Sequence, residues 1–218
     1  MPRGEIRARN AARRDHTFDL QRIIDVAKNR NLLLLAGCLV LFYFSNASLL
    51  PLLSQNLAKS HGEFGPLVMA GLVAGPQILV ALLAPWVGYW SEMFGRKPLL
   101  MAAFATEALR GVLFTFVSSP TLLLLIQLLD GITGALIAVL VVIIITDLTT
   151  GSGRFNLTQG VIGALTAAAS ALSASVMGFI ASRAGDAAGF LTMASATCLG
   201  LAVILMFLPE TKPAKYLD

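Results

Sequence analysis

The stretch Gly88-Tyr-Trp-Ser-Glu92-Met-Phe-Gly95-Arg96-Lys97 separates two long apolar segments of this 218-residue chain. It combines glycine with three charged residues, so it must stay in water while the segments on either side enter lipid. Backbone polar groups in lipid must be satisfied internally, which limits spanning segments to helices or closed barrels. The stretch therefore predicts a tight turn between two transmembrane helices. Gly95 permits the turn, and the charges indicate the side of the membrane on which it lies.

The composition excludes an ordinary soluble domain. The chain is 56% hydrophobic and 13% charged, with a mean hydropathy of +0.78, and a soluble domain of this size cannot hide that much apolar surface. Cys38 and Cys198 both lie in apolar segments, so we expect small buried hydrophobes and no disulfide or metal pair. The net charge of +4 comes from basic residues at the edges of apolar segments, where they set topology. No nucleic-acid partner is therefore predicted.

The first thirty residues are polar and rich in arginine, and no apolar core precedes Asn31, so no cleavable signal peptide is expected. Residues 1–17 predict a basic disordered segment. Residues 18–30 predict a short amphipathic helix in the cytoplasmic membrane interface, although an ordinary solvated linker helix fits the same pattern. Four acidic residues in this region disfavour a mitochondrial transit peptide: Glu5, Asp15, Asp19 and Asp25.

A transmembrane helix needs about 20 apolar residues, and six windows of the domain at 31–208 meet this requirement. The windows are 31–54, 66–90, 98–117, 121–146, 157–182 and 188–208. Residues 209–218 predict a polar cytoplasmic tail. The predicted fold class is therefore an all-α membrane protein with six transmembrane helices.

The basic residues predict the orientation. With six spans, both termini lie on one side of the membrane together with the loops at 91–97 and 147–156. That side carries all eight basic residues of the N-terminal segment and those of both loops and the tail. The other side carries only Lys59 and Arg183. Because Lys and Arg concentrate in cytoplasmic loops, both termini are predicted to be cytoplasmic.

The fifth span carries boundary signals and a small-residue stripe. Asn156 and Gln159 fit a capping box at its start, and Gly185 fits a C-terminal stop. Small residues recur at every fourth position, namely Gly163, Ala167, Ala171 and Ser175. Small residues at that period let helix backbones approach closely in lipid, so we expect this helix to be interior.

Three ionisable residues lie within spans, namely Glu107, Arg110 and Asp130, and burial in lipid makes each a functional hypothesis. At about 1.5 Å per residue, Arg110 lies roughly 18 Å from the cytoplasmic side, and Asp130 lies roughly 15 Å from either side of a ~30 Å core. These depths predict a buried ion pair between Arg110 and Asp130. Glu107 competes for the same cation, which leaves one acid to carry a proton. A cluster that only fixes helix packing fits equally well.

Uncharged polar residues give weaker signals. Candidates for a substrate cavity are Ser45, Asn46, Gln77 and Gln127. Each can instead make an ordinary interhelical hydrogen bond. The sequence contains no phosphate-binding Gly-rich loop, no Cys/His metal spacing and no nucleophile grouped with a base, so no catalytic residue, cofactor or metal is predicted.

The opening stretch, with its glycine, acid and Gly-Arg-Lys order, resembles the loop signature of the major facilitator superfamily. That signature lies between the second and third helices of each six-helix half. Met93 stands where the signature normally has a basic residue, a weakening typical of the C-terminal copy. The segment 209–212 (Pro-Glu-Thr-Lys) resembles the sequence that follows the last helix of a half. The segment 129–134, which contains Asp130, resembles helix ten of the family.

The resemblance covers about residues 18–212 and implies the C-terminal half of a secondary transporter, built from two three-helix repeats. It implies a second six-helix half as partner, either a separate chain or a second copy, besides lipid and a small-molecule substrate. By analogy, the first, second, fourth and fifth spans face that half, and the third and sixth are peripheral. Glu92 and Arg96 would make charge contacts that help to hold an outward-facing state.

The predicted function is proton-coupled transport of a small organic solute, such as efflux, across the plasma (inner) membrane. The alternatives are a six-helix membrane scaffold without transport and a truncated, inactive fragment. A membrane enzyme is disfavoured.

Overall fold

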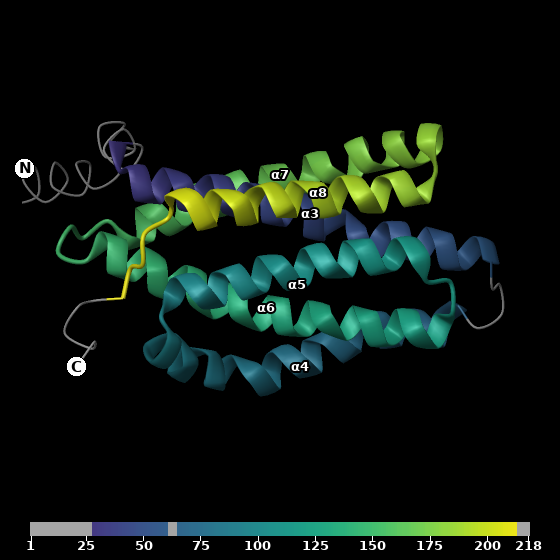
Figure 1. The fold of residues 1–218 in the computed structure, drawn as a ribbon, viewed down its shortest axis with the longest axis horizontal. Coiled ribbons are helices and arrows are strands. Elements are labelled where there is room, and N and C mark those ends of the chain that lie inside the picture. Colours follow the sequence, from purple (N-terminus) through teal and green to yellow (C-terminus); the bar gives the residue numbers. More distant parts are fainter. Residues whose placement is uncertain (1–27, 61–64, 213–218) are drawn as a thin grey trace, which may run out of the picture.

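The computed structural model describes residues 28–60 and 65–212, and this part of the chain contains α-helices and no strand. The segment expected at 1–17, most of that at 18–30, and residues 213–218 of the tail expected at 209–218 lie outside the described residues. The helices run antiparallel along the long axis, and α3 begins and α8 ends at the same end of the bundle (Figure 1). Their bounds are α3 Arg30–Ser60, α4 Gly65–Phe94, α5 Arg96–Phe116, α6 Pro120–Thr149, α7 Phe155–Ala184 and α8 Asp186–Phe207.

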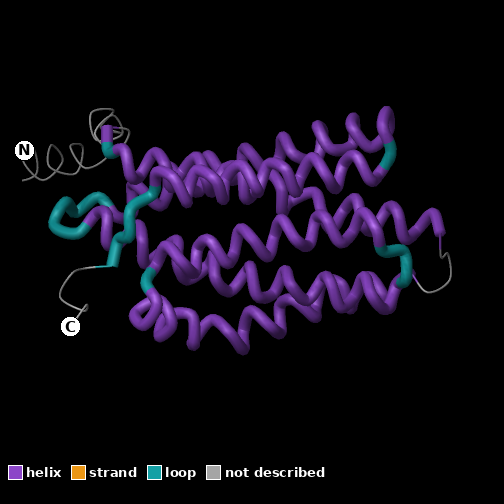
Figure 2. Tube along the Cα trace, in the orientation of Figure 1, coloured by secondary structure: helices purple, strands orange, loops and turns teal. Residues whose placement is uncertain are grey.

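Within residues 28–60 and 65–212, six helices are long and apolar enough to cross a membrane, which confirms the predicted fold class. All six begin before their predicted windows, because the first turn of a helix tolerates polar residues and proline. Gly95 alone separates α4 from α5, and Gly185 alone separates α7 from α8, so each connection is a short bend in Figure 2. The turn expected at 91–97 was therefore too long. Glu92 and Arg96 lie on helix ends.

Of the two boundary motifs predicted for the fifth span, one is wrong and one is confirmed. The capping box is wrong, since α7 begins at Phe155 and no side chain caps it. The N–H of Thr158 donates to the carbonyl of Arg154 at 2.9 Å, which starts the helix before Asn156. Gly185 is confirmed as the C-terminal stop. Its φ is +87°, and its N–H donates to the carbonyl of Ala181 at 3.0 Å.

The helix packing has an internal repeat. α3 packs on α7 as α6 packs on α4, and α3 packs on α8 as α6 packs on α5, while α5 and α8 pack on each other. Figure 1 shows the resulting layers, one with α3, α7 and α8 and the other with α4, α5 and α6. Exchanging α3–α5 with α6–α8 therefore preserves every major contact, as expected for two three-helix repeats.

The core consists of two apolar clusters separated along the helix axes by a polar layer. One cluster, around Leu39, Phe104 and Ile145, lies toward the end where α3 begins. The other, around Leu53 and Phe114, lies toward the opposite end. Buried polar residues occupy the turns between them: Ser45, Ser48, Glu107, Arg110, Gln127, Thr133, Ser173 and Thr197. The layer places ionisable side chains near the middle of the spans, where their burial is costly.

α4 and α7 are the two least buried spans. The small-residue stripe of α7 is exposed along its whole length, from Gly163 to Ser175, so the expectation that this helix is interior is wrong for the six-helix body. The opposite face of α7, including Ile162, Ser173 and Met177, packs on α3 instead. Its Ser173 hydroxyl contacts the Ser48 hydroxyl. The stripe is thus available to a neighbour outside this chain.

Candidate functional site

A charged cluster occupies the polar layer between the two apolar clusters. Arg110 on α5 donates from Nη2 to Oε1 of Glu107 at 2.8 Å, and its Nη1 forms an ion pair with Asp130 on α6. Asn46 on α3 donates from Nδ2 to Oδ1 of Asp130 at 2.8 Å. The structure therefore contains the ion pair that the matching depths of Arg110 and Asp130 predict. It also places Glu107 on the same guanidinium.

The three charged residues differ sharply in burial. The side chains of Glu107 and Arg110 are 0% and 1% exposed, whereas that of Asp130 is 25% exposed. Two carboxylates around one guanidinium leave the fully ionised cluster with one excess negative charge. An excess charge away from water is unfavourable, so binding of one proton or one cation stabilises the cluster. Asp130 is the member that an incoming group can reach.

The remaining cavity candidates occupy three different environments. Gln127 is buried beside the cluster, and its Nε2 donates to Asp130 at 3.4 Å while its Oε1 has no partner among the described residues. Ser45 is fully buried and donates to the carbonyl of Met193 at 2.9 Å, so it bridges α3 and α8. Gln77 is exposed on α4. Only Asn46 and Gln127 thus lie within hydrogen-bonding reach of the charged cluster.

A second charged network joins the ends of α4, α5 and α6. Arg96, which is 4% exposed, donates to Glu92 at 2.6 Å and to Asp147 at 3.1 Å, and also to the carbonyl of Ser91 at 2.8 Å. Our sequence reasoning missed Asp147. Its place in the last turn of the fourth span, on the same side as the opening stretch, was the available signal.

Glu210 caps α5 from the other end of the chain. Its carboxylate accepts the N–H groups of Arg96 and Lys97 at 2.9 and 3.0 Å. It also accepts those of Thr211 and Lys212, both at 3.0 Å. Burial raises the pKa of Glu210, but the four N–H donors outweigh burial and leave the pKa below its usual value. A carboxylate here also complements the positive end of the helix dipole.

Position 95 requires glycine for two reasons, its backbone conformation and the nearby carboxylate of Glu210. Its φ of +93° and ψ of 166° fall in a region that only glycine enters readily. A Cβ on Gly95 would also lie 2.6 Å from Oε2 of Glu210. Beside it, Lys97 donates from Nζ to the carbonyl of Leu205 at 3.1 Å, in the last turn of α8. The loop signature therefore ties α5 to both α8 and the segment that follows it.

Gly185 supplies a matched control for Gly95. Its φ of +87° and ψ of 163° are nearly the same, but a Cβ there would meet nothing within 4 Å. We expect Gly185→Ala to lower the free energy of unfolding by about 1–3 kcal/mol through backbone strain alone. Gly95→Ala should lower the free energy of unfolding by a larger amount, because its Cβ also displaces the carboxylate of Glu210. Unfolding titrations in detergent measure both variants, and equal losses would contradict the capping role of Glu210.

Comparison with known proteins identifies a family and several relatives. The family model described as the Major Facilitator Superfamily matches residues 33–218. Uncharacterised MFS-type transporters from two strains of Mycobacterium tuberculosis are each 33% identical over 190 residues, which is 87% of this chain and 46% of the relative. The class B tetracycline resistance protein of Escherichia coli is 37% identical over 101 residues, 46% of this chain and 23% of that protein. The chain spans about half the length of the mycobacterial relatives.

Proposed function

The chain belongs to the major facilitator superfamily, and on that premise we propose that it carries a small organic solute across the membrane in exchange for protons, as one half of a secondary transporter. The family and the six spans make it an integral, multi-pass membrane protein that acts in transport. We place it in the plasma (inner) membrane with both termini in the cytoplasm, as the distribution of basic residues favours.

The observation that carries this proposal is the cluster of Glu107, Arg110 and Asp130 at mid-length. Ionisable side chains in spans are costly to bury, and they concentrate on ion and proton pathways. The excess negative charge of the cluster favours uptake of one proton, and the partial exposure of Asp130 gives that proton an entry point. A solute cation that competes with the proton for Asp130 would couple the two fluxes.

A second six-helix half completes the proposal. The chain spans about half of its mycobacterial relatives, and α4 and α7 are the two least buried spans. The exposed stripe from Gly163 to Ser175 allows close approach of a neighbouring helix. We propose that this neighbour belongs to a separate six-helix half or to a second copy of this chain. In that assembly, the network of Glu92, Arg96 and Asp147 would hold the cytoplasmic ends together in an outward-facing state.

We propose efflux as the direction, with tetracycline as the first probe because one relative is a tetracycline resistance protein. The test reconstitutes the chain in proteoliposomes, alone and with the N-terminal half of the mycobacterial relative, under an imposed gradient of one pH unit. One pH unit is worth about 1.4 kcal/mol, so one-for-one exchange drives accumulation toward a limit of about tenfold.

Accumulation that requires the pH gradient supports the proposal. The test uses a panel of organic cations and tetracyclines. The proposal fails if no solute of this panel moves in either arm, that is, neither with the chain alone nor with the added half. The chain would then be a membrane scaffold without transport or an inactive fragment.

A further inference from the structure

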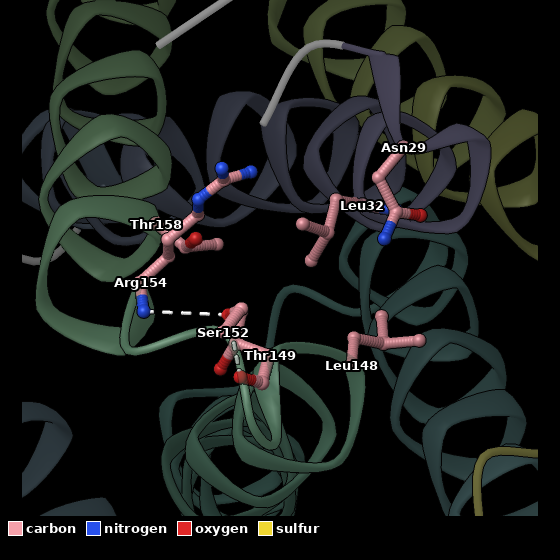
Figure 3. A pocket seen from close by; sticks show the side chains of 7 residues that line it. All are labelled: Asn29, Leu32, Leu148, Thr149, Ser152, Arg154 and Thr158. Carbon is pink, nitrogen blue, oxygen red and sulfur yellow. Dashed lines mark hydrogen bonds between the residues drawn. The ribbon is translucent and has the colours of Figure 1, made fainter. Parts of the chain in front are cut away.

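A small cavity of 70 Å³ lies where α3 and α7 begin and α6 ends. Figure 3 shows its lining, in which Thr158 and Arg154 lie across the cavity from Leu32 and Leu148. The polar members are Asn29, Thr149, Ser152, Arg154 and Thr158. This cavity lies at the helix ends, away from the charged cluster at mid-length, and the transport proposal makes no use of it.

Thr158 is the feature that points to a ligand. Its side chain is 0% exposed, and its Oγ1 has no hydrogen-bond partner among the described residues. In Figure 3 the side chain extends from α7 toward the cavity. Buried hydroxyls are nearly always hydrogen-bonded, and an unpaired one is destabilising. A ligand atom that accepts a hydrogen bond from Thr158 would remove that penalty.

The other polar groups at the cavity favour an acceptor as well. Asn29 accepts the N–H groups of Asn31 and Leu32 with its Oδ1, at 3.0 and 3.3 Å, and so caps α3. Its amide nitrogen lies on the cavity side in Figure 3 and is a hydrogen-bond donor. The hydroxyls of Thr149 and Ser152 already donate to backbone carbonyls, at 2.7 and 2.6 Å. No carboxylate is among the residues that line the cavity.

The local field has the sign that attracts an anion. Two helices begin at this cavity, and a helix N-terminus carries about half a positive charge together with N–H groups that lack intrahelical partners. No side chain caps α7, whose N-cap residue is the cationic Arg154. The C-terminus of α6 opposes this field, but the hydroxyls of Thr149 and Thr150 occupy carbonyls of its last turns.

We propose that this cavity binds an anionic phosphate group, with Thr158, Asn29, Arg154 and the first N–H groups of α7 as its donors. Helix N-termini bind phosphate for the same electrostatic reason in unrelated folds. The ends of membrane-spanning helices also lie at the depth of lipid headgroups. The phosphate can therefore come from an anionic lipid or from a soluble phosphate, and the two sources share this chemistry.

The test follows thermal unfolding of the full chain in detergent at constant ionic strength, with chloride as the reference anion. The probes are inorganic phosphate, short-chain phosphatidic acid, and phosphatidylcholine of the same chain length. Thr158→Val removes the unpaired hydroxyl and keeps nearly the same shape. Thr166→Val is the matched control, because its hydroxyl on the same helix donates to the carbonyl of Gly163 at 3.0 Å, outside the cavity.

We expect Thr158→Val to unfold at the same temperature as the wild type, or higher, without ligand, and to bind the phosphate probe about tenfold more weakly. Thr166→Val should bind it as the wild type does. Stabilisation by both anionic probes identifies a site for free phosphate, and stabilisation by phosphatidic acid alone identifies a lipid site. The proposal is overturned if neither anion stabilises the wild type, if phosphatidylcholine acts as well as phosphatidic acid, or if Thr158→Val responds like the wild type.

Discussion

Arg110→Met is expected to lower the free energy of unfolding by about 3–5 kcal/mol, a large share of the total for a typical protein. Arg110 is 1% exposed and contacts both Glu107 and Asp130. Methionine has a similar length but leaves the two carboxylates without their shared cation. An unpaired buried charge is far more destabilising than the loss of a surface ion pair. Unfolding titrations in detergent, together with the yield of folded protein, measure the effect.

Two further variants separate charge from shape. Arg183→Met removes an exposed arginine that lies 5.3 Å from the ring of Phe179, and we expect a loss within about 1 kcal/mol. Arg110→Met combined with Glu107→Met replaces the buried pair with apolar groups of similar size, which is often close to neutral. This double variant should recover most of the loss and leave Asp130 hydrogen-bonded to Asn46. A loss below 1 kcal/mol for Arg110→Met alone would show that the cluster contributes little to folding.

The ion pair was predictable because depth in a bilayer is nearly a one-dimensional quantity. Counting residues from the ends of two consecutive spans places Arg110 and Asp130 at the same height, and adjacent antiparallel helices then bring them together. The six apolar windows of sufficient length likewise predict the number and order of the helices. Both inferences depend on neighbours along the chain, which a single sequence reveals directly.

Contacts between segments far apart in the sequence were not predictable. Glu210 caps the helix that begins at Arg96, 114 residues earlier, and the Pro-Glu-Thr-Lys segment carries no sign of that partner. The prediction that the small-residue stripe of α7 makes this helix interior was wrong for a related reason. Small residues indicate close packing, but they do not show whether the packing partner lies within the chain or outside it. The capping box at Asn156 was predicted wrongly because such a pattern can also occur within the first turn of a helix that begins at an earlier residue.

Asp130→Asn is expected to abolish accumulation driven by the pH gradient while the protein remains folded. Asparagine keeps the shape of the side chain, and its Oδ1 can still accept from Asn46. Its amide can donate to Oε1 of Gln127, which has no partner among the described residues, once the Gln127 amide turns over, and Arg110 keeps its bond to Glu107. The variant lacks the one carboxylate of the cluster that an incoming group can reach, so the solute has no proton to exchange with at that position. Loss of a positioned proton-transfer group typically lowers a rate by about a hundredfold or more, and we expect that size of fall in the initial rate.

Glu107→Gln makes the same change of one charge at a position that is 0% exposed, so it is the matched control. Arg110 then pairs with Asp130 alone, and the half-buried carboxylate of Asp130 stays within reach of an incoming group. We therefore expect transport that remains coupled to the pH gradient. Proteoliposomes that contain both halves report the initial rate and its dependence on the gradient for the two variants. Full coupling in both would exclude a proton-carrying role for the cluster. Loss in Glu107→Gln alone would mean that the fully buried acid carries the proton and that exposure does not select the carrier.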